Sequence, residues 1–244
     1  MVQSVSRALA LLSEVAEQPA GLANLASRTD LALSTASRLL STLEDSGAVE
    51  RDSDGVYRVG PTIAGIGPAI GGPSMQALAQ NHLADLASEL DEAVCLSVLA
   101  GQQTRTLVQV DVPRPVQAQD WTGMSWPLDS GGSGVVLLAT QPVDRLAVFE
   151  DVPSAEVLAE ARRRGVSWTH GGYVEGLSSV AAAVVSPDGV GRAAVVAYGP
   201  SYRFPVTDQV TSDERIAEIE QAVMACAAVI SADLAASWPS GARS

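Results

Sequence analysis

The chain has 244 residues, of which 47% are hydrophobic and 18% are charged, and its net charge at pH 7 is −13. A chain of this size folds as one large domain or two ordinary ones and buries a substantial core. The acidic balance argues against a protein that coats nucleic acid non-specifically, because such binding requires many cationic side chains to neutralise phosphates. All fifteen basic residues are arginines, so any DNA contact must come from a few well-placed ones, with helix N-termini and backbone amides.

No run of the sequence approaches the roughly 18 to 20 uncharged apolar residues of a membrane span, so we expect no membrane partner. Residues 1–7 lack the apolar core of a signal peptide, which predicts a cytoplasmic protein. Cys95 and Cys226 stand inside apolar runs and are predicted to be packed free thiols. His82 and His170 have no second ligand at a useful spacing, so we predict no metal site and no cofactor.

Residues 1–47 contain three helical patterns. The first helix is predicted to end at Gln18–Gly21, and a second, short helix follows over 22–26. The third is predicted from Ser34, a good N-cap residue, to Gly47, which tolerates the left-handed conformation of helix ends. The apolar positions of the first and third helices are Val5, Ala8, Leu9, Leu12, Val15 and Ala16, and Ala36, Leu39, Leu40 and Leu43. Small hydrogen-bonding side chains and one arginine of the third helix are predicted to point away from the core. A helix that lies in a DNA major groove needs such a surface.

Two strands are predicted over 48–51 and 56–59, around the hairpin signal Asp54-Gly55. Three helices followed by a hairpin indicate a winged helix-turn-helix domain over 1–60. The alternative is a small helical bundle packed on the rest of an enzyme.

Dense glycines and prolines over 61–73 predict a linker. Beyond it we predict helices over 75–90, 133–139, 154–164 and 212–236, paired strands over 93–99 and 103–112, a strand over 166–169, and a hairpin of strands over 178–186 and 191–198. This mixture predicts an α+β domain over 74–244 with a central antiparallel sheet.

The chain resembles the IclR family of bacterial transcriptional regulators over nearly its whole length. The stretches that carry the resemblance are Val5–Leu12, Leu33–Glu44 and Gly55–Gly60 in the first domain and, more loosely, Pro127–Ala139, Gly165–Thr169 and Gly176–Val184 in the second. The resemblance implies that residues 74–244 form a GAF-like effector-binding and oligomerisation domain. It also implies a repressor that acts as a homodimer or homotetramer on a pseudo-palindromic double-stranded DNA operator and responds to a small-molecule effector.

The departures from the family pattern lie in the second domain. Asp129 replaces a frequent histidine, Val135 a lysine, Thr169 an aspartate, Ser179 a cysteine and Ala183 a proline. DNA binding is therefore better supported than any particular effector, and a regulator whose degenerate sensor domain only oligomerises remains the alternative.

The predicted DNA contacts are Ser34, Thr35, Ser37, Arg38 and Thr42 of the third helix, Arg51 and Arg58 of the wing, and Arg7 of the first helix. Arg38 can read guanine or clamp a phosphate through its planar fork. Its possible helix partners Glu44 and Asp45 lie six and seven residues away, outside the three or four that such pairs require. For the wing arginines the alternative is a cross-strand ion pair with Glu50, Asp52 or Asp54, and Arg7 is either a backbone contact or an ordinary solvated side chain.

The glycine-rich stretch 130–134 precedes a helix and offers backbone N–H groups to an anion. It is neither a nucleotide P-loop nor a hydrolase elbow, because the residues after it fit neither pattern. The resemblance makes Gly132 and Ser133 anion donors and adds Thr169 and Ser179 from the facing strands. Met124, Trp126, Leu128 and Trp168 are candidate apolar walls, with a place in the core as the alternative. Hydroxyls in place of the aspartate and cysteine favour a carboxylic acid or a neutral acceptor as effector. An enzyme that uses Ser130 or Ser133 would lack a visible base, which argues against catalysis.

Overall fold

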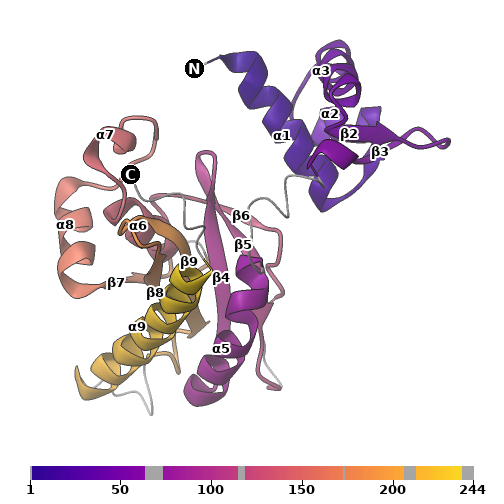
Figure 1. The fold of residues 1–244 in the computed structure, drawn as a ribbon. Helices are drawn as coiled ribbons and strands as arrows, with labels where there is room; N and C mark the ends of the chain where they lie inside the picture. Colours follow the sequence, from indigo (N-terminus) through magenta and orange to yellow (C-terminus); the bar gives the residue numbers. More distant parts are fainter. Residues whose placement is uncertain (1, 64–73, 115–118, 173, 206–212, 238–244) are drawn as a thin grey trace. The chain divides into compact units, whose positions relative to one another are not determined.

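The computed structural model describes residues 2–63, 74–114, 119–172, 174–205 and 213–237. They belong to two compact units, Met1–Gly72 and Pro73–Ser244 (Figure 1). The division falls within the predicted linker, of which residues 64–73 lie outside the described residues.

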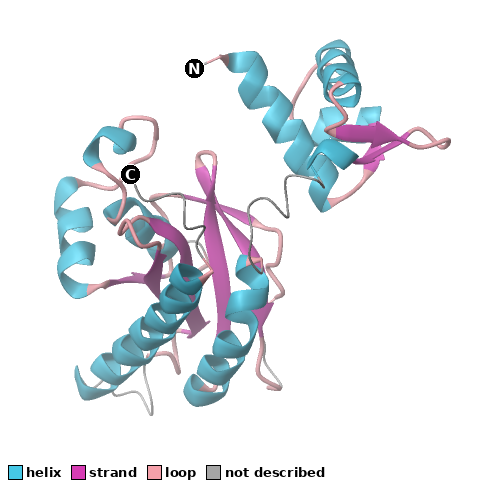
Figure 2. Ribbon diagram, in the orientation of Figure 1, coloured by secondary structure: helices cyan, strands magenta, loops and turns pink. Residues whose placement is uncertain are grey.

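The first unit is a winged helix-turn-helix, as predicted (Figure 2). Its helices are α1 (Gln3–Glu17), α2 (Leu22–Arg28) and α3 (Leu33–Asp45), and its strands are β1 (Ala20–Gly21), β2 (Val49–Arg51) and β3 (Val56–Val59), in the order β1-β3-β2. Leu11, Val15, Leu25, Ala36 and Leu40 are fully buried at its centre. Strand β1 is too short to leave a strand pattern in the sequence, and its pairing with β3 closes the sheet.

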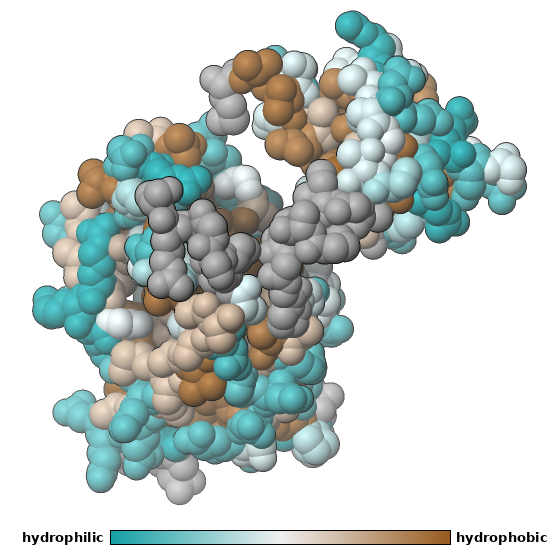
Figure 3. Space-filling model, in the orientation of Figure 1, coloured by the Kyte–Doolittle hydropathy of each residue, from teal (hydrophilic) through white to brown (hydrophobic). Residues whose placement is uncertain are grey.

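The predicted buried face of α1 is partly wrong. Val5 and Leu9 are 56% and 57% exposed, whereas Leu11, outside the predicted stripe, is fully buried. The sequence of α1 marks one apolar face, and the core covers the side that carries Leu11 and Val15 and leaves Val5 and Leu9 outside. Brown, hydrophobic atoms are visible on the surface over α1 in Figure 3.

The predicted N-cap of α3 is also wrong. The helix begins at Leu33 with Ala32 as the cap residue, and Ser34 lies inside the first turn. The turn after α2 fixes this start: Asp30 adopts a positive φ of 51°, and the Leu31 N–H donates to the Ala26 carbonyl at 2.9 Å. The entry to α3 is therefore set by backbone geometry and not by a capping hydroxyl.

The end of α3 follows the prediction. Gly47 has a φ of 69°, its N–H donates to the Glu44 carbonyl at 2.9 Å, and the Ala48 N–H donates to the Leu43 carbonyl at 2.8 Å. This is the hydrogen-bond pattern of a Schellman motif. Thr62, which follows the wing, attaches here too, because its N–H donates to the Gly47 carbonyl (3.0 Å) and its hydroxyl to the Ser46 carbonyl (2.8 Å).

The second unit is an α+β fold around a six-stranded antiparallel sheet of order β6-β5-β4-β9-β8-β7, which confirms the predicted central sheet. Its strands are β4 (Ala93–Ala100), β5 (Gln103–Val110), β6 (Ser125–Pro127), β7 (Val166–His170), β8 (Leu177–Val185) and β9 (Gly191–Pro200), and its helices are α5 (Met75–Leu90), α6 (Gly132–Ala139), α7 (Val143–Leu146), α8 (Ala155–Arg164) and α9 (Asp213–Ala236). The elements β6 and α7, of three and four residues, are absent from the prediction because such short segments leave no periodicity.

Helices cover both faces of this sheet (Figure 1). Helices α5 and α9 pack on one face, against side chains such as Val94, Val180 and Val195. Helix α6 packs on the other, against Cys95, Ala181 and others that alternate with the first set. Because both faces are covered, β8 and β9 are nearly continuous runs of alanine and valine.

Helix α9 is long and apolar enough to cross a membrane by length and composition alone, although its longest stretch without a charged residue, 221–232, is shorter than the roughly 18 to 20 uncharged residues of a membrane span. Core helices of soluble proteins pass the same test. Ile219, Val223 and Ile230 of α9 are fully buried in the core against α5 and the sheet.

Candidate nucleic-acid interface and effector pocket

Helix α3 presents its polar side chains outward. Ala36 and Leu40 are buried, Leu39 and Leu43 pack at the edge of the core, and Ser34, Ser37, Arg38 and Thr42 are exposed. Thr35 is half-buried. The predicted groove-reading face therefore exists as a surface of the first unit.

A groove of about 510 Å³ runs between α1 and α3. It brings together four of the predicted DNA contacts, Arg7 from α1 and Thr35, Arg38 and Thr42 from α3. Among the described residues, neither Arg7 nor Arg38 has an ion-pair partner, so the alternative pairing of Arg38 with Glu44 or Asp45 does not occur. Both guanidinium groups are available to an external anion.

The wing arginines are already engaged. Arg58 Nε donates to Asp52 Oδ2 at 3.2 Å, the cross-strand ion pair that was the alternative for this residue. Arg51 lies over the ring of Tyr57, with its guanidinium carbon 5.5 Å from the ring centroid. The pKa of Asp52 is lowered, chiefly by the N–H of Val56 and then by Arg58.

The second unit contains a cavity of about 80 Å³ between the sheet and the start of α6. Its described walls are Cys95, Ser97, Thr106, Trp121, Trp126, Ser130, Gly131, Gly132, Ser133, Thr169, Gly172, Val174, Leu177, Ser179, Val196 and Tyr198. None of these side chains carries a formal charge when the Cys95 thiol is protonated, and burial raises the pKa of that thiol to about 12. The cavity is therefore a neutral site rich in hydroxyl groups.

The start of α6 forms one wall of this cavity. Its cap residue, Gly131, has no side chain to satisfy the first N–H groups, which lack partners within any helix. A Cβ on Gly132 would lie 2.6 Å from the carbonyl oxygen of Ser167, so glycine is required for this close packing. The Ser133 hydroxyl lies 3.3 Å from the Thr104 hydroxyl, which holds it in the buried wall.

Five of the eight predicted effector residues line the cavity: Gly132, Ser133, Thr169, Ser179 and Trp126. Thr169 and Ser179 are paired in register on β7 and β8, so their side chains share one face of the sheet.

The other three predicted residues lie elsewhere. Trp168 precedes Thr169 on β7 and therefore points to the opposite face, where its Nε1 donates to Glu220 at 2.7 Å. Leu128 is fully buried in the cluster that joins α6 to α8, and Met124 is 41% exposed. The prediction that they form apolar walls of this cavity is corrected accordingly.

Several cavity residues have no counterpart in the sequence-based prediction. The Tyr198 ring stacks on Trp121 with centroids 4.8 Å apart, and Trp121 meets Trp126 edge-on at 5.2 Å. The pKa of Tyr198 is raised, first by burial. Tyr198 pairs with Ser179 across β9 and β8, which places it on the cavity face. Only this pairing between distant strands reveals its role, because β9 reads as a uniformly apolar strand.

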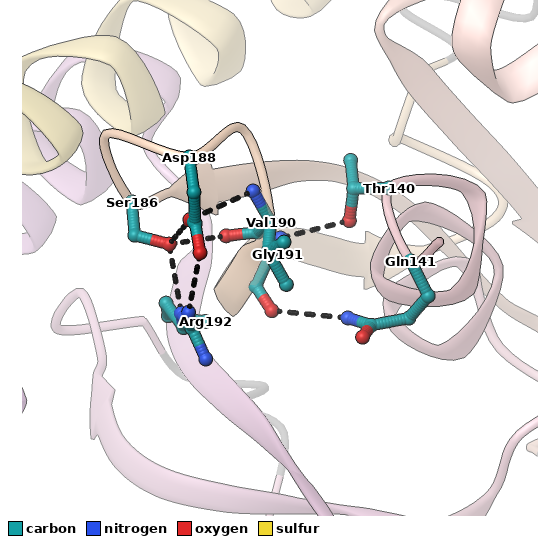
Figure 4. Close-up of polar contacts among 7 residues, drawn as sticks. All are labelled: Thr140, Gln141, Ser186, Asp188, Val190, Gly191 and Arg192. Atoms are coloured by element: carbon teal, nitrogen blue, oxygen red, sulfur yellow. Dashed lines mark hydrogen bonds and ion pairs between the residues drawn. The ribbon is translucent and has the colours of Figure 1, made fainter. Parts of the chain in front are cut away.

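The far end of α6 is fastened to the β8–β9 hairpin, as Figure 4 shows. The Gly191 N–H donates to the Thr140 hydroxyl at 3.1 Å, and Gln141 Nε2 donates to the Gly191 carbonyl at 3.3 Å. Within the hairpin, Arg192 donates to Ser186 (2.7 Å) and Asp188 (3.0 Å). Hydrogen bonding to Ser186 is the main cause of a lowered pKa at Asp188. This network fixes the helix whose other end borders the cavity.

Residues 4–53 match the model of the IclR helix-turn-helix domain, and residues 69–232 match that of the bacterial transcriptional regulator IclR C-terminal domain. The chain is 36% identical over 151 residues to the HTH-type transcriptional regulator Rv1719 of Mycobacterium tuberculosis, a match that covers 60% of this chain and only 57% of that relative. It is 32% identical over 259 residues to the glycerol operon regulatory protein of Streptomyces griseus, covering 96% and 97% of the two chains. Both relatives are regulators, which argues against the enzyme alternatives.

The fold is similar to that of an IclR homologue from Microbacterium hydrocarbonoxydans, solved in complex with 4-hydroxybenzoate. The TM-score is 0.61 at 22% identity, and the alignment covers 95% of this chain and 99% of that one. Because the C-terminal family match alone spans well over half of its residues, the chain belongs to the IclR family and is a DNA-binding transcriptional regulator.

Proposed function

We propose that this regulator represses transcription from a double-stranded DNA operator and that a small carboxylic acid in the cavity of the second unit controls its hold on DNA. The observation that carries the proposal is the convergence of the start of α6 with the hydroxyls of Thr169 and Ser179 in one neutral cavity. The direction of regulation, repression, follows the resemblance to the family.

The groups that line this cavity favour the binding of a carboxylate. The start of a helix favours a negative charge through its free N–H groups and its dipole, and hydroxyl groups donate further hydrogen bonds. No carboxylate lines the cavity among the described residues, although the negative charge of Asp111 acts on Cys95 and Tyr198 in its wall. The 4-hydroxybenzoate in the related structure is a small carboxylic acid and supports this class.

On the DNA side, the exposed face of α3 would lie in the major groove. Arg38 would read a base or clamp a phosphate, with Thr35 and Thr42 beside it, and Arg7 would reach the backbone across the α1–α3 groove. Ser34 and Ser37 share the exposed face, and Arg51 and Arg58 stand on the wing.

Binding through so few cations requires more than one copy. Residues 1–60 hold five arginines against eight acidic residues, a net charge of −3. Linking two or four reading heads in a homodimer or homotetramer raises the affinity without new contacts. The effector would act by changing the spacing of two heads relative to their half-sites, in the cytoplasm where the operator is located.

The experiment starts with an operator that the wild-type protein selects from a random DNA library. Small aliphatic and aromatic acids are screened by thermal shift, and each hit is tested for release of the operator in a gel-shift assay. We expect a hit to raise the melting temperature, and Ser179→Ala to reduce that rise because a hydrogen-bond donor is lost. Ser88→Ala, at an exposed position of α5, is the matched control.

A hit that stabilises wild type and Ser179→Ala equally would move the effector site away from this cavity. If no acid stabilises the protein while the operator still binds, the sensor domain only oligomerises, which is the competing reading. If an effector strengthens operator binding, the proposed mechanism of ligand-induced release is wrong, and the ligand acts as a co-repressor.

A further inference from the structure

The hydroxyl group of Thr42, on the exposed face of α3, already has a hydrogen-bond partner within the helix. It donates to the Arg38 carbonyl oxygen one turn earlier, at 3.0 Å. A threonine hydroxyl has a single proton, so the Thr42 oxygen can accept a further hydrogen bond but cannot donate one. This bond turns the oxygen toward the helix backbone, and the Cγ2 methyl group is then the branch of the side chain that is free to contact a partner.

The groove between α1 and α3 surrounds Thr42 with two kinds of group. Arg7 and Arg38 line it, and among the described residues neither guanidinium has an ion-pair partner. Apolar side chains from both helices supply further lining: Val5, Ala8, Leu39 and Leu43. Unpaired cations beside apolar groups complement the major groove of DNA, where phosphates flank the base edges and thymine alone carries a methyl group.

The committed hydroxyl limits which bases Thr42 can recognise. Guanine offers only acceptors in the major groove, and these require a donor that Thr42 lacks. In an A·T pair, adenine offers an N–H that the Thr42 oxygen can accept, and thymine offers a methyl group for the Cγ2 atom. Cytosine also offers an N–H, so for this side chain the thymine methyl is what distinguishes an A·T pair from a G·C pair.

We propose that Thr42 is a specificity-determining residue whose methyl group recognises the C5-methyl group of a thymine in each operator half-site. The inference rests on the proposed function, which places the exposed face of α3 in the major groove. It adds the base that Thr42 reads and the chemical group through which it does so. Four residues span about 6 Å along a helix, so Arg38 and Thr42 reach different base pairs of one half-site.

The test replaces the thymines of one half-site of the selected operator, one at a time, by deoxyuridine, which lacks only the methyl group. Gel-shift titration of the full chain at fixed salt measures the affinity. For at least one thymine we expect wild type to bind the uracil operator about fourfold more weakly, the value of one buried methyl-sized group. Thr42→Ser, which keeps the hydroxyl and loses the methyl, should bind both operators equally. Thr42→Val, which keeps a methyl and loses the hydroxyl, should retain the preference for thymine.

Thr29→Ser is the matched control. The Thr29 hydroxyl also donates to the carbonyl oxygen four residues earlier, that of Leu25, at 2.8 Å, but Thr29 lies outside the groove. This variant should therefore show the wild-type preference for thymine. Thr42 is exposed on its helix, so its substitutions leave the core of the unit untouched.

An equal response of wild type and Thr42→Ser to uracil at every thymine would overturn the inference. Loss of the preference in Thr42→Val would also overturn it, because the hydroxyl would then make the contact. If Arg38→Ala still weakens operator binding in these cases, the proposed place of α3 in the major groove stands. If Arg38→Ala and Thr42→Ser both bind the operator as wild type does, the proposed DNA interface is wrong as well. A changed oligomeric state of Thr42→Ser in sedimentation would assign the groove to a second copy of the chain and overturn the inference.

Discussion

The arginines of the first unit differ in what already holds their guanidinium groups. Arg28 joins α2 to α1 through Glu14, at 2.7 Å from its carboxylate, and Arg58 pairs with Asp52 within the wing. Arg7 and Arg38 have no such partner among the described residues and share one groove. The cationic charge that DNA can use without breaking a protein contact is therefore concentrated between α1 and α3.

Arg38→Ala should weaken operator binding by about 1–3 kcal/mol for each bound reading head, because it removes a guanidinium from the recognition helix. A gel-shift titration at fixed salt measures the loss. Arg145→Ala, at an exposed position of α7 in the second unit, is the matched control and should leave the affinity unchanged. Undiminished affinity in Arg38→Ala would remove this residue from the DNA interface.

Asp52 makes the stability of the wing depend on pH. Its pKa in the folded chain is lowered, mainly by the N–H of Val56, so the folded state favours the carboxylate. The stabilisation is present above the unfolded pKa of about 3.9 and is lost as pH falls through the lowered folded value. Asp52→Asn should therefore be less stable than wild type near pH 7, with the difference shrinking toward pH 2.

Urea unfolding at a series of pH values measures this difference. Glu50→Gln removes the same charge from the same hairpin, at a residue whose side chain makes no hydrogen bond or ion pair among the described residues, and should not reproduce it. A stability gap between wild type and Asp52→Asn that does not narrow on acidification contradicts the assignment.

At the scale of elements, α6 is fixed at both ends. Its start packs against backbone at Gly132 and Gly134, where a Cβ would meet Ser167 and Leu128, and its end is hydrogen-bonded to Gly191. A helix held in this way offers its first N–H groups at a constant position. Preorganisation of this kind lowers the cost of ordering the site when a ligand binds.

The end of the wing packs closely against the end of α3 and the start of β2 at Gly60. A Cβ on Gly60 would meet the carbonyl oxygen of Gly47 and lie 2.9 Å from the carbonyl carbon of Val49, and neither backbone atom can move freely. Gly60→Ala should therefore lower the free energy of unfolding of this unit by about 1–3 kcal/mol.

Thermal and urea unfolding monitored by circular dichroism check this value. Gly21→Ala is the control, because its Cβ would have only one neighbour, at an ordinary 3.7 Å, and its φ is −75°. Similar free energies of unfolding for the two variants would show that the backbone around Gly60 accommodates a Cβ without loss of stability.

Local patterns predicted the elements well where they were long. The periodicity of α5 and the paired strands β4 and β5 gave bounds within a few residues of those observed. Local sequence patterns predicted only some of the residues that line the cavity. Thr169 and Ser179 stand in motifs, whereas Tyr198 and Trp121 reach the site through pairing between strands and through packing of a loop, which no local pattern encodes.

At the scale of the whole molecule, each of the two units has its own core, and the two differ in net charge. The first has a net charge of only −3, so most of the acidic excess lies in the second. An acidic second unit discourages non-specific attraction to DNA, and under the proposed function recognition then depends on a few contacts made by several reading heads together.

The attachment of Thr62 to Ser46 and Gly47 has a mechanical consequence. The chain leaves the first unit from the end of the recognition helix itself, held there by two hydrogen bonds. A displacement of the chain at residue 62 is therefore felt first at the C-terminal end of α3, the element that carries the outward-facing polar side chains.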